Sequence, residues 1–436
     1  MNFDNAHGHG HGHRHGGDRR EIEAVPVRRA LAAVVLVVAA VAAVGIVLWW
    51  PSGDPEVDRE VLGFGSRVEA TVTSAERTEC AADPEAQCHV VRARVTSGPD
   101  AGDTAEFEVT VDVDTPASEL GPGDEIVLND AGADVPPEVR YSFADMQRST
   151  PLLVLGAVFA VVVVALGRLR GLAALVGIGV SMGILLAYIF PALLAGSPPL
   201  GVALSGAVVI AFATLYLAHG VNDRTTVALV GTLASLALTA ALAVGFSAAA
   251  ELSGLASEES INLLAFAPDL DFRGLLLAAV VIGTLGVLDD VTVTQVSAVW
   301  ELRRTDPSLR ARALYAAGIR IGRDHIASTV NTLVLAYAAA ALPLLLLFTQ
   351  SGLSFAEILS SETVAVEIVQ TLVGSIGLVA SVPLTTGLAC WVVTRADPLA
   401  PPDPYEWRQE PEPERGPYGY QEPPPDPFWG AVPPRR

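Results

Sequence analysis

Two adjacent carboxylates, Asp289 and Asp290, interrupt an otherwise apolar stretch that runs from Gly274 to Trp300. The stretch is long enough to cross a bilayer as one helix. A charged side chain in the middle of such a helix costs about 3 kcal/mol or more, so it is retained only where a partner, a proton or a water-filled cavity lies opposite. The pair therefore predicts a polar site within a membrane.

Helical spacing places Asp290 on a polar face of this stretch. Residues recurring at steps of three and four share one side of a helix, and here they are Gly283, Gly286, Asp290, Thr294, Ser297 and Glu301. Asp289 is rotated by about 100° from Asp290, beside Thr292. We expect this face to line a site that handles a proton, an ion or a solute. In the alternative interpretation, Asp290 only hydrogen-bonds a neighbouring helix and fixes its packing.

Two later apolar stretches carry further polar residues that could complete the site. Arg323 precedes the first of them, where pairing with Asp289 or Asp290 would reduce the cost of burying both charges. Glu367 lies one or two turns into the second, and it could instead be an interfacial glutamate that faces an aqueous loop. The candidate cavity residues are Asp289, Asp290, Thr294, Ser297, Glu301, Arg323, Asp324, Asn331, Thr332 and Glu367.

Composition places the whole chain among membrane proteins. Its mean hydropathy is +0.44, and 51% of its 436 residues are hydrophobic while 17% are charged. Eight apolar runs have about the length of a membrane crossing: 30–48, 151–166, 172–190, 200–218, 227–249, 274–296, 326–348 and 364–393. We expect an all-α polytopic bundle of eight transmembrane helices. The net charge of -21 must then lie outside the bilayer.

The arginines orient this predicted bundle. If there are eight crossings, the arginine-rich connections all fall on one side, which the positive-inside rule assigns to the cytoplasm. Both termini are then cytoplasmic in a multi-pass protein of the plasma membrane, and the first crossing is a retained signal anchor. The connection 303–323 mixes arginines with apolar residues, which predicts an amphipathic helix on the inner membrane surface.

A soluble segment, 51–150, separates the first two crossings and falls on the extracytoplasmic side. Alternating residues predict strands at 68–73, 89–95, 107–111 and 125–128, with Gly and Pro turns between them. Four or five short strands are typical of a small β-barrel-like domain of the OB or SH3-like type. Cys80 and Cys88 would form a disulfide in an oxidising compartment, and the alternative is two free thiols.

The two ends of the chain are low in complexity. Histidines alternate mostly with glycine near the N-terminus, at His7, His9, His11, His13 and His15. Such a tail could hold a divalent transition metal such as zinc, nickel, copper or cobalt, although an expression tag would look similar. The Pro-rich end cannot bury a core. The predicted domains are 1–29, the anchor 30–50, the β domain 51–150, a seven-helix unit 151–395 and the tail 396–436.

Two functional hypotheses from different classes fit these features. The first is a permease that moves a small ion or polar solute through the carboxylate-lined cavity. The second is a non-transporting assembly or sensor protein whose β domain binds a partner. No enzymatic activity is expected, because the sequence lacks a nucleotide-binding loop and a Ser/His/Asp arrangement. An intramembrane aspartyl protease would need facing aspartates, and the Gly-x-Gly-Asp motif is absent before Asp289.

The expected partners follow from the same features. They are the lipid bilayer, a small ion or polar solute, and a second copy of the chain or another membrane subunit. No nucleic acid is expected. The sequence does not indicate the substrate, the coupling ion or the direction of movement.

Two motifs resemble those of the YibE/F-like family of membrane proteins. They are Gly283 to Glu301, with its paired aspartates, and Ile321 to Tyr337, which begins Ile-Gly-Arg-Asp-His. The resemblance covers roughly residues 150–395 and implies a multi-pass membrane protein and, at most, a permease. In the family pattern the intramembrane acid corresponds to Asp290, with hydroxyls at Thr294 and Ser297 and an acid at Glu301. Asp289 is additional to that pattern.

Overall fold

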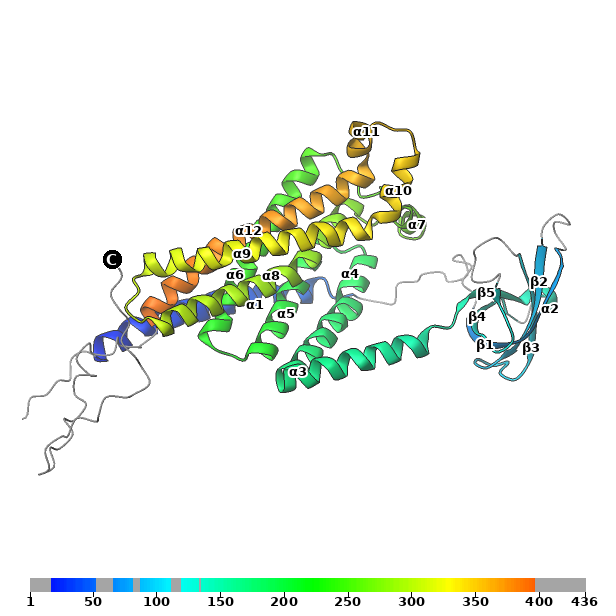
Figure 1. The fold of residues 1–436 in the computed structure, drawn as a ribbon, viewed down its shortest axis with the longest axis horizontal. Coiled ribbons are helices and arrows are strands. Elements are labelled where there is room, and N and C mark those ends of the chain that lie inside the picture. The colour runs from blue at the N-terminus through cyan, green and yellow to red at the C-terminus, as the bar shows by residue number, and fades with distance from the viewer. Residues whose placement is uncertain (1–16, 52–65, 81–86, 111–118, 133–134, 397–436) are drawn as a thin grey trace, which may run out of the picture.

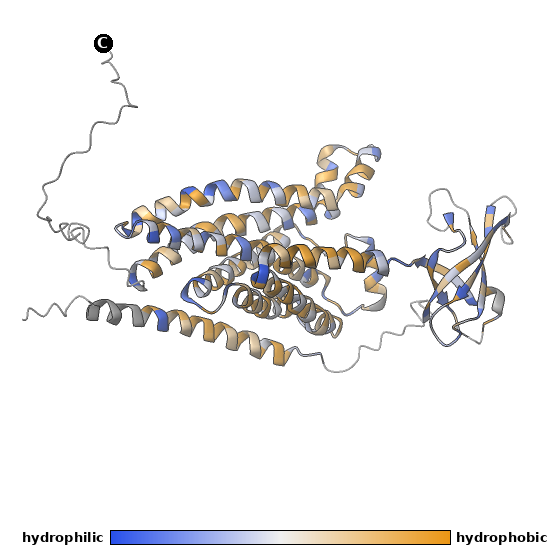
Figure 2. Cartoon of the chain, turned by 60° about the horizontal axis from the view of Figure 1, so that its bottom comes forward, coloured by the Kyte–Doolittle hydropathy of each residue, from blue (hydrophilic) through white to orange (hydrophobic). Residues whose placement is uncertain are grey.

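The computed structural model describes residues 17–51, 66–80, 87–110, 119–132 and 135–396. Figure 1 shows two parts, a bundle of long helices and a small β domain, joined through helix α3. Figure 2 shows long apolar stretches along the helices and a mixture of polar and apolar residues in the β domain. The histidine-rich segment and the Pro-rich tail lie outside the described residues.

Six helices of the described chain are long and apolar enough to cross a membrane. They belong to α1 (Gly17–Leu48), α3 (Ser149–Ile184), α5 (Pro199–His219), α6 (Asp223–Ala249), α8 (Phe272–Thr305) and α12 (Glu362–Ala396). A seventh candidate is the pair α9 (Ala311–Ala340) and α10 (Leu342–Gln350), bent by 62°. Large apolar side chains such as Leu36 and Leu166 are 69% and 83% exposed, as contact with lipid would require.

Helix α3 folds back sharply at Arg168, so that Figure 1 shows it as two legs. Arg168 has φ 53° and ψ -131°, outside the helical region. At the fold, Gly171 lies so close to the Val163 carbonyl that a Cβ atom there would overlap it. The expected crossings 151–166 and 172–190 fall on the two legs. Counting α3 once explains why the described helices give six or seven candidates rather than eight.

The second leg of α3 continues into a π-helical turn and a short helix. The turn is η2 (Leu185–Ile189), and the helix is α4 (Phe190–Leu194). Within η2, the Tyr188 hydroxyl is buried and shares a hydrogen bond with Ser205 of α5, 2.7 Å between oxygens. This contact fixes the second leg against α5.

Helix α9 begins earlier than the sequence predicted, and the expected surface helix over 303–323 was wrong. Helix α8 runs to Thr305, and α9 begins at Ala311 after a short turn. The first turns of α9 pack within the bundle rather than on a surface, because Leu314, Gly318 and Gly322 are buried there. At the other end Pro343 ends the run, because proline lacks an N–H and clashes with the preceding turn.

Helix α12 packs against α6, α8 and α9 through glycines that face hydroxyl side chains. The facing pairs are Gly231 with Thr385, Gly377 with Thr239, Gly374 with Thr284, and Gly318 with Thr386. Small residues let helix backbones approach closely in a membrane. Helix α12 continues through Pro383 as one helical element. Two short helices, α7 (Glu258–Phe266) and α11 (Phe355–Ser360), lie in the connections.

The β domain is a curled antiparallel sheet in the order β3-β2-β1-β4-β5. Its strands are β1 (Ser66–Glu79), β2 (Gln87–Val95), β3 (Thr104–Thr110), β4 (Glu125–Asp130) and β5 (Tyr141–Met146), with the short helix α2 (Pro137–Arg140) before β5. The four predicted strands are present, and β5 is the additional one. Alternating residues such as Val91, Ile126 and Leu128 are fully buried on one face. The edge strands β3 and β5 contact each other.

Candidate functional site

Asp289 is half-buried in the bundle, and one of its carboxylate oxygens is fully enclosed. Its side chain points from α8 toward α5, where the Thr214 hydroxyl lies 3.2 Å from its Oδ2. The same hydroxyl lies 2.9 Å from the Ile210 carbonyl and 3.4 Å from the Ala211 carbonyl, so its one proton is shared among three acceptors. The other carboxylate oxygen, Oδ1, is buried without a partner among the described residues. A carboxylate with a buried, unpartnered oxygen is costly unless it binds a proton, a cation or water.

Asp290 is exposed and lines neither of the two pockets described below, whereas the sequence predicted a cavity around it. Helix α8 buries Leu288, Val291 and Thr292 against the core of the bundle. A turn of about 100° per residue then directs Asp289 toward α5 and leaves Asp290 on the outer side. The rest of the predicted face lies with Asp290, since Gly283, Gly286, Thr294 and Glu301 are exposed and Ser297 is half-buried.

The predicted residues of α9 also lie away from the core. The exposed residues are Arg323, Asp324, Asn331 and Thr332. Helix α9 instead turns Gly318 and Gly322 inward, against Gln295 of α8. No ion pair joins Arg323 to Asp289 or Asp290 in the described part of the chain, and that expectation was wrong. The inward side of α9 carries Leu314 and apolar residues such as Ile326 and Val330 with these glycines, so its polar residues lie on the other side, away from the core.

A pocket of about 820 Å³ opens at the end of the bundle where arginines gather, and we call it the basic pocket. Its charged and titratable lining consists of Arg28, Arg170, His219, Asp223, Arg224 and Arg304. Val293 and Ser297 line it from α8, one and two turns from Asp289 along that helix. Val293 lies about 40° around the helix from Asp289, whereas Ser297 lies closer to the Asp290 side. At 1.5 Å per residue, Asp289 lies about 6 Å along the axis beyond Val293.

A smaller pocket, about 290 Å³, contains Glu367 near the start of α12. It also includes Thr363, Gln370 and Ser257, and Leu275 and Ala279 of α8. Glu367 is half-buried. Two predicted site residues line a pocket: Glu367 lines this smaller one, and Ser297 lines the basic pocket. The structure places these two residues in different pockets rather than in one.

Sequence reasoning missed a layer of buried polar residues between α6, α8 and α12. Thr232 and Thr292 share a hydrogen bond of 2.6 Å, and both are fully buried. Gln295 donates to the Gly318 carbonyl at 2.9 Å and to the Thr386 hydroxyl at 2.7 Å, so it joins three helices. The signal was the recurrence of Gly, Ser and Thr at helical spacing in 231–239 and 374–386.

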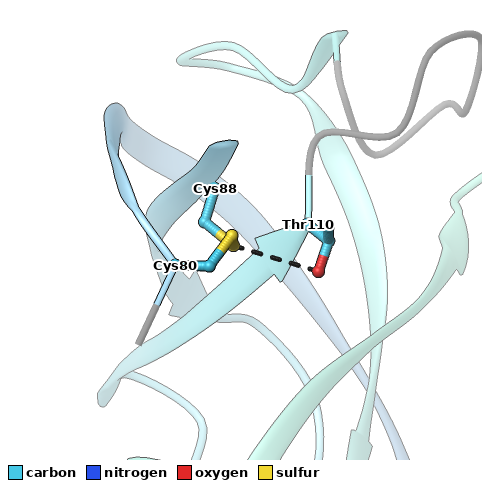
Figure 3. Close-up of a disulfide and its surroundings, with 3 residues drawn as sticks. All are labelled: Cys80, Cys88 and Thr110. Carbon is cyan, nitrogen blue, oxygen red and sulfur yellow. Dashed lines mark hydrogen bonds between the residues drawn. A yellow bond between two sulfur atoms is a disulfide. The ribbon is translucent and has the colours of Figure 1, made fainter. Parts of the chain in front are cut away.

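The cysteines of the β domain form a disulfide. The sulfur atoms of Cys80 and Cys88 are bonded, with their Cα atoms 4.9 Å apart (Figure 3). The Cys88 sulfur also lies 3.9 Å from the Thr110 hydroxyl of β3. The sulfurs and Glu108 are close enough together to resemble a metal site, but sulfurs in a disulfide are not thiolate ligands. His7, His9, His11, His13 and His15 lie outside the described residues.

The helices from the first leg of α3 to α12 match a protein-family model. The match, to the YibE/F-like protein model, covers residues 155–395, more than half of the chain. The chain belongs to the YibE/F-like protein family. No curated protein and no solved structure matches it. The family region contains Asp289 and every charged residue of the basic pocket except Arg28, whereas α1 and the β domain lie outside it.

Proposed function

We propose that this YibE/F-like protein is a permease that moves a small ion or polar solute along the side of α8 that carries Asp289. The observation that carries the proposal is the half-buried Asp289 carboxylate, which has one shared donor and one buried oxygen without a partner among the described residues. Such a group gains free energy by binding a proton, a cation or water, and these are the exchanges that a transport site requires.

The two pockets support a path past this carboxylate. The larger reaches α8 at Val293 and Ser297, and the smaller reaches it at Leu275 and Ala279. Leu275 and Val293 lie within about 40° of Asp289 around α8, and Ala279 and Ser297 lie about 40° further on, toward the Asp290 side. Val293 is the lining residue of the basic pocket that lies one helical turn from Asp289. We propose that it acts as a gate there.

The proposal places the protein in the plasma membrane with eight crossings, counting both legs of α3. The arginines of the basic pocket then face the cytoplasm, as do both termini. The curled sheet, closed by the contact between β3 and β5, is proposed to be an extracytoplasmic barrel of the OB or SH3-like type. We assign the chain no enzymatic activity.

A reconstitution experiment tests the transport proposal. The full chain is placed in liposomes that contain a pH-sensitive dye, and gradients of sodium, potassium, zinc or phosphate are imposed in turn. We expect at least one gradient to drive a proton flux that Asp289→Asn abolishes, while Asp290→Asn retains most of it. If both variants behave as the wild type, the carboxylate has no transport role. Size-exclusion profiles check that each variant is folded.

A link to metal remains a proposal for the N-terminal histidines. Cellular metal content and metal sensitivity can be compared in a deletion strain complemented with the full chain or with a chain lacking residues 1–17. We expect truncation to alter sensitivity to zinc, nickel, copper or cobalt. An unchanged metal profile in the deletion strain would remove metal from consideration.

One observation favours the alternative, a non-transporting assembly or sensor protein. Asp290 and Thr294 of α8 and Asn331 of α9 are exposed on apolar helices, where a second copy or another membrane subunit could cover them. Under this alternative, Asp290→Asn disrupts a crosslinked complex, whereas Asp289→Asn has no effect on proton flux. The two variants therefore separate the two functions.

A further inference from the structure

The basic pocket gathers more positive charge than the chain neutralises. Its lining has four guanidinium groups and one carboxylate, Asp223. Asp223 pairs with Arg28, with 2.9 Å between Oδ2 and Nε. Arg304 approaches Glu301 at 3.7 Å on the exposed surface, where such a pair is weak. Arg170 and Arg224 form no ion pair with any residue that the structure describes.

Separate elements converge to build this pocket. Arg28 comes from α1, Arg170 from the second leg of α3, Arg224 from the first turn of α6 and Arg304 from the last turn of α8. The α6 helix begins here, with the Asn222 side chain accepting the Thr225 N–H at 3.0 Å. The positive end of the α6 dipole therefore adds to the arginine charge.

We infer that the basic pocket binds a phosphate group. Guanidinium groups match phosphate oxygens with paired hydrogen bonds, and arginines from different helices can surround one anion. The volume of about 820 Å³ exceeds the needs of a bare phosphate, and Trp300, Val393 and Ala228 provide an apolar wall for an attached organic part. The phosphate could belong to the headgroup of an anionic lipid or to a soluble ion. Its binding does not require that the protein transports anything.

Thermal unfolding of the purified full chain tests this inference. In one arm, inorganic phosphate is titrated against the protein in phosphatidylcholine nanodiscs, with chloride holding the ionic strength constant. In the other arm, phosphatidylglycerol replaces part of the phosphatidylcholine. Stabilisation by phosphate identifies a soluble anion, and stabilisation by phosphatidylglycerol alone identifies a lipid headgroup. Stabilisation by neither would overturn the inference.

Variants distinguish a built site from diffuse surface charge. Arg170→Gln and Arg224→Gln are each expected to weaken phosphate-group binding by about tenfold, because each removes charge-assisted hydrogen bonds. Arg312→Gln and Arg320→Gln are matched controls, since both are exposed arginines of α9 that do not line the pocket. Unfolding without ligand reports the folding of each variant. Equal loss in pocket and control variants would show that general charge, and not this pocket, attracts the anion.

Discussion

The Thr214 hydroxyl is the donor that reaches the Asp289 carboxylate, with 3.2 Å between Oγ1 and Oδ2. It belongs to α5 and also lies 2.9 Å from the Ile210 carbonyl of its own helix. The hydroxyl can therefore turn toward either acceptor without moving its helix. The Thr214 hydroxyl can thus donate to the Asp289 carboxylate or turn away from it when the carboxylate binds or releases a proton or an ion.

Replacing Thr214 tests this relationship. Thr214→Val keeps the shape of the side chain but removes the hydroxyl, so the carboxylate loses its one described donor. We expect the Asp289-dependent proton flux to fall by about tenfold, since an unsatisfied buried group costs about 1–3 kcal/mol. Thr214→Ser restores the hydroxyl and should retain most of the flux. Equal flux in the Val and Ser variants would show that the hydrogen bond has no part in transport.

A second prediction concerns the close contact between α12 and α6. A Cβ at Gly377 would overlap the Thr239 hydroxyl, whereas a Cβ at Gly387 would meet its nearest atom, in Tyr315, at 3.8 Å. Gly377→Ala should lower the free energy of unfolding by about 1–3 kcal/mol through overpacking. Gly387→Ala, on the same helix, should be neutral or gain up to about 1 kcal/mol. Thermal unfolding in detergent measures both.

A compensating change makes this prediction specific. Thr239→Ala removes the hydroxyl that the new methyl group would overlap, so it should recover much of the stability lost in Gly377→Ala. If the double variant is as unstable as the sum of the single variants, the contact between these two residues is not the cause.

Apolar length and helical periodicity predicted most of the bundle but not the direction of its faces. The expected runs 200–218 and 227–249 correspond to α5 and α6 within a few residues. Periodicity also grouped Asp290 with Thr294, but it cannot say whether their shared face meets another helix. The direction of that face depends on tertiary packing, because α8 packs against the bundle through Leu288 and Thr292. Asp289, which helical spacing placed beside that face, is instead the residue with a buried, unpartnered carboxylate oxygen among the described residues.

The buried hydroxyl layer was harder to predict for a different reason. Ser and Thr side chains in a helix can donate to the carbonyl four residues earlier, as Ser235 and Thr239 do. They therefore cost little in lipid, and hydropathy does not separate buried from lipid-facing hydroxyls. The contact between Thr232 of α6 and Thr292 of α8 depends on how these two helices pack, which the pattern of either helix alone does not predict. In the β domain, strict alternation left less ambiguity, and the four predicted strands are present.

A third prediction concerns the ion pair of the β domain. Arg140 bonds both Asp130 carboxylate oxygens, at 2.7 and 3.0 Å, and also contacts Asp100. The hydrogen bonds from Arg140 hold the pKa of the Asp130 carboxyl below its ordinary value. The pair therefore stabilises the fold fully above the unfolded pKa of about 3.9, and this contribution is lost as the pH falls through the lower folded pKa.

Hydrogen exchange in the full chain measures this effect. Arg140→Gln should speed amide exchange in β4 and β5 at neutral pH, because it leaves the Asp130 carboxylate buried without its partner. The difference from the wild type should shrink in strong acid, once Asp130 is protonated in both proteins. Arg148→Gln breaks an exposed pair with Asp145 and should change exchange little. Exchange that differs equally at all pH values would exclude the ion pair as the cause.

The last prediction concerns the disulfide that links the ends of β1 and β2. Replacing Cys80 and Cys88 with alanine removes a cross-link that closes a loop of sequence separation 8. A loop of this length should contribute about 2–3 kcal/mol, chiefly by restricting the unfolded chain. Amide exchange in β1 and β2 should therefore accelerate in the double variant, while exchange in α6 and α8 stays unchanged. Cys390→Ala is the matched control, because Cys390 is a free, buried cysteine of α12. Faster exchange in the helices as well would mean that the β domain and the bundle unfold as one unit.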